Sequence, residues 1–278
     1  LRLNPGVAAQ THAAVRTGDG DSKFGFGEHE LEAPLATARR TPGLRLLGIH
    51  VHLGSQIFAQ GPYLEALARA LSAYRCVLAS GAPGGVLVIG GGFGVDPLPG
   101  AAPFALADTL AALAAALDGA CAEASLVRPV LGIEPGRFLV AEAGISLYRV
   151  LALKDRGTRR FAIVDGSLAD NPRPALYDAY HHPALASRES AAPLVETTVC
   201  GRSCENDELA AAPLPADLAP GDLLALATTG AYTFSMASNY NRFVRPPLVF
   251  AGGGTHRAVV RRESIDDLLR TELPCDAP

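Results

Sequence analysis

Apolar and polar positions along residues 1–140 fall into two kinds of segment, short apolar runs and longer stretches with helical spacing. The apolar runs are LRLN (1–4), LLGIHVHLG (46–54), GVLVIGGG (85–92) and PVLGIEPG (129–136). Nearly continuous apolar runs of this length are typical of strands that are buried on both faces of a sheet. Each run therefore predicts one strand of a parallel sheet.

The segments between these runs carry apolar residues at helical spacing. The first stripe consists of Leu64, Leu67, Leu71, Tyr74 and Leu78, with Pro62 near its start and Gly81 at its end. The second consists of Leu106, Leu110, Leu113 and Leu117, opened by Pro103 and closed near Gly119. A third helix, weakened by Pro34, is predicted over residues 28–40. Alternation of strands and helices predicts an α/β domain with helices on at least one side of the sheet.

The pattern changes after residue 144, where short apolar segments are separated by loops rich in proline and glycine. The segments are ISLYRVLALK, RFAIVDG, TTVCG, DLLALATTG, PPLVF and RAVVRR, and only residues 263–270 have helical spacing. Short strands with such turns predict an all-β domain. The predicted domains are residues 1–144 and residues 145–278.

Composition narrows the classes of function. The chain has 278 residues, a net charge of −4 and five cysteines. Mild acidity gives no reason to expect a nucleic acid or an anionic membrane as a partner, and no apolar run approaches the length of a bilayer span. An odd, unpatterned set of cysteines suits a reducing compartment, so a cytoplasmic protein is expected.

Candidate chemistry gathers at the ends of the predicted strands. Glycines 90 to 92 can bring backbone N–H groups close to a phosphate, and Arg137 can add a charged contact. Glu134 then faces something cationic, and a protonated pyridine nitrogen suits it, as in pyridoxal phosphate. The alternative for the Glu134–Arg137 segment is a surface turn with an ion pair.

A metal site is the competing interpretation of GIHVHLG. His50 and His52 lie two apart on one strand, so their side chains share a face. A metal centre needs further histidine or aspartate ligands at later strand ends, and those ends carry glycines and Glu-Pro-Gly-Arg. No metal is therefore expected.

At this point the motifs resemble those of a known family. The chain resembles the fold-type III pyridoxal-phosphate decarboxylases, and within them the diaminopimelate branch. The matching blocks, in the family's order, are RLNPGV, THAAVRTGDGDSKFGF, GIHVHLGSQI, IGGGFG, EPGR, VDGSLADNPRPALY, CENDE and TGAYTFSMASNYN. They cover the chain almost from end to end. The resemblance implies decarboxylation of meso-2,6-diaminopimelate to L-lysine and CO2, with pyridoxal 5'-phosphate as cofactor.

The resemblance also implies roles for individual residues. His52 stacks on the pyridine ring and Glu134 holds the ring nitrogen, while Tyr232 touches both cofactor and substrate. The expected phosphate contacts are Ser55, Gly90, Gly91, Gly92, Gly136 and Arg137, and the polar groups of the substrate are bound by Arg137, Arg173 and Tyr177. Across a homodimer, Cys204 donates the proton after CO2 leaves and Glu205 binds the far end of the substrate. Without the resemblance, the two tyrosines would be interpreted as core residues and Arg173 as a solvated side chain.

The chain departs from the family at its N-terminal side. These decarboxylases bind their cofactor through a lysine on the first barrel strand, and neither Lys23 nor Lys154 fits that block. The expected fold class is therefore the second half of an alanine-racemase-like (β/α)8 barrel followed by a domain of the β-sandwich or Greek-key type. A chain that lacks the first strands and the lysine is expected to be inactive alone.

Two rival functions stay open. The substrate could be another amino acid, such as ornithine, arginine or carboxynorspermidine, although Cys-Glu-Asn favours the diaminopimelate branch because the ornithine branch usually has Cys-Asp. A non-catalytic binding homologue is the rival from another class. Retention of His52, Glu134, Arg137 and Cys204 argues against it.

Overall fold

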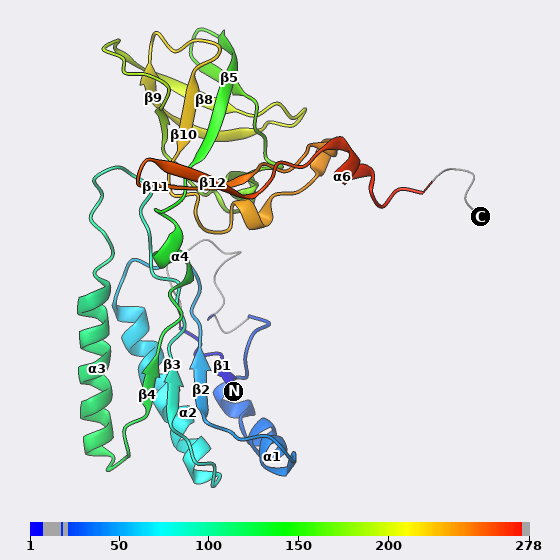
Figure 1. The fold of residues 1–278 in the computed structure, drawn as a ribbon. Helices are drawn as coiled ribbons and strands as arrows, with labels where there is room; N and C mark the ends of the chain where they lie inside the picture. Colours follow the sequence, from blue (N-terminus) through cyan, green and yellow to red (C-terminus); the bar gives the residue numbers. More distant parts are fainter. Residues whose placement is uncertain (8–17, 19–21, 274–278) are drawn as a thin grey trace. The chain divides into compact units, whose positions relative to one another are not determined.

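The computed structural model describes residues 1–7, 18 and 22–273, which form two compact units (Figure 1). The first unit comprises residues 1–96 and 101–139, and the second comprises residues 97–100 and 140–278. The structure thus divides the chain between Leu139 and Val140, a few residues before the boundary predicted at residue 144.

The first unit is built on a four-stranded parallel sheet in the order β1-β2-β3-β4. Its strands are Arg2–Leu3, Gly48–Val51, Val86–Val88 and Val130–Gly132. Each lies inside one of the four apolar runs, so the α/β prediction is confirmed. The strands are shorter than the runs because the glycines and histidines at the run ends leave the sheet and form the loops that follow it.

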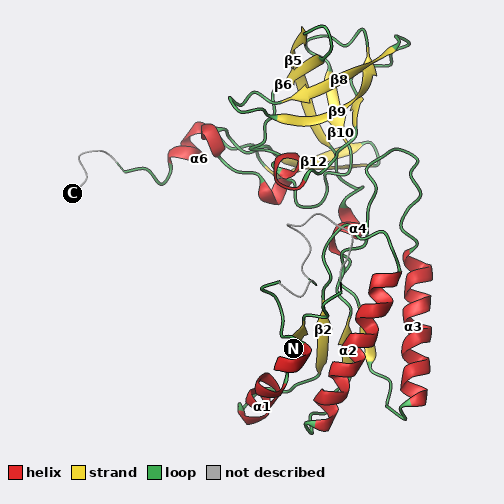
Figure 2. Cartoon of the chain, turned by 180° about the vertical axis from the view of Figure 1, so that it is seen from behind, coloured by secondary structure: helices red, strands yellow, loops and turns green. Residues whose placement is uncertain are grey.

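Helices cover one face of this sheet. They are α1 (Glu32–Arg40), preceded by a 3-10 turn η2 (Glu28–Glu30), α2 (Gly61–Ala79) and α3 (Leu106–Glu123). The short helix α4 (Gly136–Val140) follows β4 beyond the strand ends. Figures 1 and 2 show α2 behind the strands in one view and in front of them in the other. Ile49 and Val51 of β2 join Leu67 of α2 and Leu113 of α3 in one buried core.

Two helix ends differ from their sequence prediction. Pro34 lies in the first turn of α1, where backbone N–H groups have no acceptor within the helix, so the proline costs little there. Helix α3 continues past Gly119 to Glu123, because Leu117 and Cys121 are both buried and keep that face packed against the core. Burial therefore outweighs the helix-weakening effect of one glycine.

The second unit contains a six-stranded sheet in the order β7-β10-β5-β6-β8-β9. Its strands are Pro183–Leu185 (β7), Leu223–Leu226 (β10), Ser146–Asp155 (β5), Arg160–Val164 (β6), Leu194–Cys200 (β8) and Glu208–Pro215 (β9). All neighbours are antiparallel except β6 and β8. The two edge strands, β7 and β9, contact each other, so the sheet is barrel-like and nearly closed. The sequence analysis expected a β-sandwich or Greek-key arrangement for this domain.

Several elements of this unit were missed from sequence. Strands β7 (PAL) and β9 (ELAAAPLP) are rich in alanine and proline, which strands rarely favour, and both lie at an edge of the sheet order, where proline is tolerated. The short helix α5 (Arg173–Tyr177) and the 3-10 turns η3 (Phe234–Met236) and η4 (Tyr240–Arg242) were also missed. The hairpin β11–β12 (Leu248–Gly252, Thr255–Val260) and helix α6 (Ile265–Leu269) fall where predicted.

Two features apply to the described residues of both units. None of their helices is long and apolar enough to cross a membrane. The four cysteines at positions 76, 121, 200 and 204 are all free thiols.

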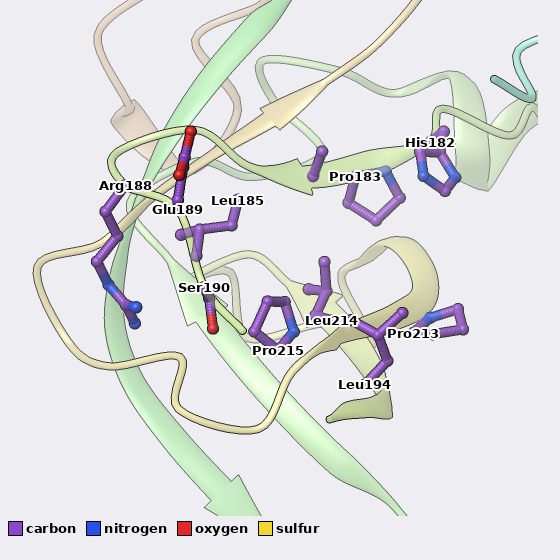
Figure 3. A pocket seen from close by; sticks show the side chains of 11 residues that line it. His182, Pro183, Leu185, Arg188, Glu189, Ser190, Leu194, Pro213, Leu214 and Pro215 are labelled. Atoms are coloured by element: carbon purple, nitrogen blue, oxygen red, sulfur yellow. The ribbon is translucent and has the colours of Figure 1, made fainter. Parts of the chain in front are cut away.

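One buried carboxylate anchors the loops at the rim of the six-stranded sheet. Arg188 donates from Nε to Asp222 Oδ1 and from Nη2 to Asp222 Oδ2, each at 3.0 Å. The Ser187 hydroxyl and the Ala219 backbone N–H also donate to this carboxylate. Figure 3 shows the neighbouring hollow of about 500 Å³, with Arg188 and Ser190 on one side and His182 on the other. Four donors on Asp222 hold its pKa at about 2.

We predict that Asp222→Asn lowers the free energy of unfolding by roughly 1–2 kcal/mol at pH 7, because the variant loses charged hydrogen bonds at a buried position. The pKa of Asp222 is depressed below its ordinary value of 3.8, so its stabilising effect is complete above about pH 4 and is lost as the pH falls through about 2. Urea unfolding at pH 7 and at pH 2 measures both effects.

The matched control is Asp217→Asn, since Asp217 pairs with the same arginine but its side chain is 47% exposed. The control variant should lose less stability than Asp222→Asn at pH 7. Equal losses, or a difference for Asp222→Asn that persists at pH 2, would contradict the prediction.

Candidate functional site

The candidate cofactor residues of the first unit lie at the carboxyl ends of three neighbouring parallel strands. Strand β2 is followed by His52, β3 by the glycine loop 90–92, and β4 by Glu134. In Figure 1 these strands run side by side in one direction, so their ends share one edge of the sheet. A backbone bond of 2.8 Å from Glu134 N to Gly90 O joins the last two loops.

His52 is held against the glycine loop. The backbone N–H of Gly91 donates to His52 Nδ1 at 3.3 Å, so the proton of the neutral ring is on Nε2. Burial lowers the pKa of His52, and the nearby charge of Arg2 and the ring of His50 lower it further. The imidazole is therefore neutral at physiological pH. A neutral ring can stack on a protonated pyridine, whereas a cationic ring would repel it.

Glu134 is hydrogen-bonded to His50, which the sequence analysis considered as a possible metal ligand. His50 Nε2 lies 3.0 Å from Glu134 Oε2, and the two residues come from β2 and from the loop after β4. The side chain of Glu134 remains 55% exposed, so its carboxylate is accessible to a second partner. His50 appeared in the sequence analysis only as half of a candidate metal pair. Among the described residues, no group of three or more histidine, cysteine or acidic side chains is arranged to hold a metal ion.

The predicted phosphate contacts Ser55 and Arg137 are brought together. Arg137, in the first turn of α4, donates from Nε and from Nη2 to Ser55 Oγ, both at 3.4 Å. Gly136 begins the same helix. The site thus places a guanidinium and a hydroxyl beside the glycine loop, and these side-chain donors are suited to a phosphate dianion.

The glycines between these residues are required by space. A Cβ at Gly91 would overlap the carbonyl oxygen of Glu134, and a Cβ at Gly92 would overlap the carbonyl oxygen of Gly54. Gly92 also has a φ of +85°, which L side chains rarely adopt. The loop after β3 can therefore approach the loops on both sides only when it carries no side chains.

In the second unit, three predicted substrate residues form one cluster. The guanidinium carbon of Arg173 lies 5.2 Å from the centre of the Tyr177 ring and 5.7 Å from that of Tyr232. Arg173 is only 6% exposed, and among the described residues its Nε has no hydrogen-bond partner. Burial lowers the pKa of this side chain. A buried guanidinium with an unused donor is suited to bind a carboxylate or phosphate.

The CENDE loop presents Cys204 and Glu205, both exposed. Tyr240 donates its hydroxyl to Glu205 Oε1, and Asn241 Nδ2 donates to Glu205 Oε2 at 3.4 Å. The same amide nitrogen lies 4.0 Å from Cys204 Sγ. The bond from Tyr240 is the main reason that the pKa of Glu205 is lowered. Neither Tyr240 nor Asn241 was assigned from sequence, although both lie in the TGAYTFSMASNYN block.

Asp207 is a further missed residue, and it fastens this loop to the VDGSLADNP segment. Its carboxylate is 4% exposed and accepts the backbone N–H of Leu168 at 2.7 Å and that of Ser203 at 3.2 Å. Burial raises the pKa of Asp207, although both hydrogen bonds oppose the shift. An acid inside an acidic motif gave no sequence signal that distinguished it from its exposed neighbours.

One block of the resemblance, THAAVRTGDGDSKFGF, lies largely outside the described residues. Of its predicted features, Lys23 is described and exposed, and its ammonium lies 5.1 Å from the centre of the Phe24 ring. Lys154 lies in strand β5 of the second unit.

Comparison with known proteins identifies the class to which these features belong. Residues 1–141 match the family model described as pyridoxal-dependent decarboxylase, pyridoxal binding domain. The chain belongs to the pyridoxal-dependent decarboxylase family, and its cofactor is pyridoxal phosphate. The strand-end residues described above fit that group, since they offer phosphate donors, a neutral stacking ring and a carboxylate within one unit.

Individual relatives are more specific. The chain is 45% identical over 279 residues to diaminopimelate decarboxylase of Actinosynnema pretiosum subsp. auranticum, covering 98% of this chain and 62% of the relative. It is 40% identical over 281 residues to diaminopimelate decarboxylase of Halalkalibacterium halodurans, covering 99% and 64%. The crystal structure of Helicobacter pylori diaminopimelate decarboxylase complexed with L-lysine aligns with a TM-score of 0.86 and 32% identity, covering 97% and 65%. The chain therefore spans slightly less than two thirds of the length of these relatives.

We predict that Gly91→Ala weakens binding of pyridoxal phosphate by roughly tenfold, the equivalent of about 1.4 kcal/mol of misfit. The added methyl group would overlap the Glu134 carbonyl oxygen and push the glycine loop away from its neighbours. Titration with pyridoxal phosphate, followed by absorbance and fluorescence, measures the affinity.

Gly119→Ala is the control, because a Cβ at Gly119 in helix α3 meets no atom within 4 Å. This variant should bind the cofactor like the unmodified protein and gain a few tenths to about 1 kcal/mol of stability from better helix propensity. Identical affinities for Gly91→Ala and Gly119→Ala would show that the glycine loop does not contact the cofactor.

Proposed function

We propose that the protein is a pyridoxal-phosphate-dependent carboxy-lyase that converts meso-2,6-diaminopimelate to L-lysine and CO2. The observation that carries this proposal is the 45% identity to a diaminopimelate decarboxylase across 98% of the chain. The geometry supports it independently. The first unit places the Arg137 guanidinium and the Ser55 hydroxyl together, as a phosphate group requires, and the second unit places a buried arginine beside two tyrosines.

In the proposed enzyme the first unit holds the cofactor, which when bound supplies an electron sink for the pair left by the departing carboxylate. Ser55, Arg137 and the backbone of Gly90, Gly91, Gly92 and Gly136 bind the phosphate. His52 stays neutral and stacks on the ring. Glu134 faces the ring nitrogen. The hydrogen bond from His50 supports this role, because it fixes one carboxylate oxygen and leaves the other side of the group exposed.

The side chains that bind the substrate have charges opposite to those of its carboxylate and ammonium groups. Arg173 and Arg137 are suited to its carboxylates, and Tyr177 and Tyr232 supply hydroxyls beside Arg173. Glu205, whose lowered pKa keeps it ionised, binds the ammonium group at the distal end. Cys204 carries a proton on Sγ and delivers it to the carbon that has lost CO2. We propose that these last two residues act in the site of the partner subunit of a homodimer.

The finer description of the fold is part of the same proposal. The four parallel strands with their helices are the second half of an alanine-racemase-like (β/α)8 barrel, and the second unit, with its nearly closed sheet, is a β domain of the sandwich or Greek-key type. A cytoplasmic location accords with four free thiols among the described residues.

The proposed activity is tested by assaying the protein at its full natural length with pyridoxal phosphate. Release of CO2 and formation of L-lysine from meso-2,6-diaminopimelate are expected, with at least tenfold lower kcat/KM for L-ornithine and L-arginine. A preference for ornithine or arginine would support the rival substrates. Cofactor binding without turnover of any of the three would support the non-catalytic alternative.

We predict that Cys204→Ala lowers kcat about 100-fold while KM changes little, because a general acid acts in the transition state and adds little to ground-state binding. Steady-state kinetics with meso-2,6-diaminopimelate measure both constants. Cys200→Ala is the matched control. Cys200 lies half-buried in β8, and burial raises its pKa to about 11, so its removal should leave kcat unchanged. Equal kcat values for the two variants would exclude Cys204 as the proton donor.

A further inference from the structure

Two segments of the second unit that are more than thirty residues apart in sequence lie side by side at the CENDE loop. Residues 239–243 contact residues 202–205 at four points. Three are the contacts of Tyr240 and Asn241 with Glu205 and Cys204 described above. The fourth is the guanidinium of Arg202, whose central carbon lies 4.3 Å from the centre of the Phe243 ring. The Cys204–Glu205 pair is therefore held from one side by the Asn-Tyr-Asn turn.

The turn that makes these contacts is strained and firmly braced. Asn241 has φ 53° and Arg242 has φ 60°, a left-handed conformation that costs side-chain-bearing residues free energy. Asn239 braces the turn, since its Nδ2 donates to Phe243 O at 2.9 Å and to Glu263 Oε2 at 2.6 Å. Arg245 Nε donates to the other oxygen of Glu263 at 2.7 Å. Strain that is maintained by a network of polar bonds is typical of functional positions.

The pKa shifts of Glu205 and Tyr240 have the same cause, the hydrogen bond between them. The hydrogen bond from Tyr240 lowers the pKa of Glu205, and the same bond raises the pKa of Tyr240. The phenol therefore remains the donor and the carboxylate remains the ionised acceptor. Each carboxylate oxygen has two lone pairs, and Tyr240 and Asn241 each use one on a different oxygen. The group keeps acceptor capacity while its orientation is fixed.

We propose that Tyr240 and Asn241 are positioning residues that pre-orient the Cys204–Glu205 pair, so that the Glu205 carboxylate is set to select substrates with a distal ammonium group. Tyr240 orients the carboxylate and stabilises its ionised form. Asn241 links it to the thiol through one amide group. The inference rests on the proposed function of Glu205 and Cys204, and it extends that function to the turn that determines their geometry.

Tyr240→Phe tests the first contact in the full-length holoenzyme. Loss of one charged hydrogen bond at an exposed site should raise KM for meso-2,6-diaminopimelate about 3- to 10-fold, with kcat within about twofold of the unmodified enzyme. Because the bond lowers the pKa of Glu205, its loss should also move the acidic limb of the kcat/KM profile to higher pH. Tyr180→Phe is the control, since that hydroxyl contacts His182, away from the pair. Kinetic constants and pH profiles that match those of the control would overturn the inference.

Asn241→Gly tests the second contact without adding strain, because glycine adopts the left-handed conformation freely. Its control is Arg242→Gly, which makes the same change at the neighbouring left-handed residue, whose side chain pairs with Glu272. The measurement is the rate of alkylation of Cys204 by iodoacetamide at pH 8, resolved by mass spectrometry in protein without cofactor. Removal of the amide that lies 4.0 Å from Sγ releases the thiol from its neighbour, so Asn241→Gly should speed alkylation about 2- to 5-fold relative to Arg242→Gly. Equal rates would overturn the role of Asn241.

These readouts separate the inference from the proposed function. If the unmodified enzyme does not act on meso-2,6-diaminopimelate, the proposed function fails, while the alkylation rates still test the geometry. If it acts and both variants behave like their controls, only the positioning role fails.

Discussion

The first unit depends on one steric constraint, the close approach of the loop after β3 to the loops after β2 and β4. Gly91 lies against the carbonyl of Glu134 and Gly92 against the carbonyl of Gly54, with no room for a side chain at either position. This approach allows Gly91 N to reach His52 and Glu134 N to reach Gly90 O. Three strand ends are thereby joined by hydrogen bonds at one edge of the sheet. The same packing sets Gly92 against Ser55, which with Arg137 is proposed to bind the phosphate.

The second unit relies on charged side chains whose partners are fixed by burial. Asp222 and Asp207 are both nearly buried carboxylates that tie loops together through backbone N–H groups. Their pKa values shift in opposite directions. Asp222 has the guanidinium of Arg188 as a partner, whereas backbone N–H groups donate to Asp207 and burial dominates its pKa. Arg173 is the contrasting case, since its Nε has no partner among the described residues. Buried carboxylates with several hydrogen-bond donors stabilise the scaffold. A buried arginine with an unused donor is suited to bind a ligand.

Sequence patterns predicted the parallel strands, because buried apolar runs and helical stripes both reflect local burial. They missed β9, whose alanines and prolines are accepted only because the strand lies at the edge of the sheet order. Among the site residues, the pairing of His50 with Glu134 spans 84 positions and crosses β3, so no local pattern indicates it. The contacts of Tyr240 and Asp207 are of the same kind. Each depends on which loops meet in space, and that is decided by the whole sheet rather than by neighbouring residues.

The two histidines of GIHVHLG lie two residues apart, yet they have different partners in the structure. On sequence alone both are candidate ligands on one face of a strand. In the structure His50 Nε2 meets a carboxylate oxygen, whereas His52 Nδ1 accepts a backbone N–H. A chelating pair would need one lone pair from each ring directed at a common point, and these nitrogens are turned toward different protein groups. The loop that carries Glu134 thus makes His50 a partner of the carboxylate. The glycine loop orients the ring of His52, and burial keeps that ring neutral.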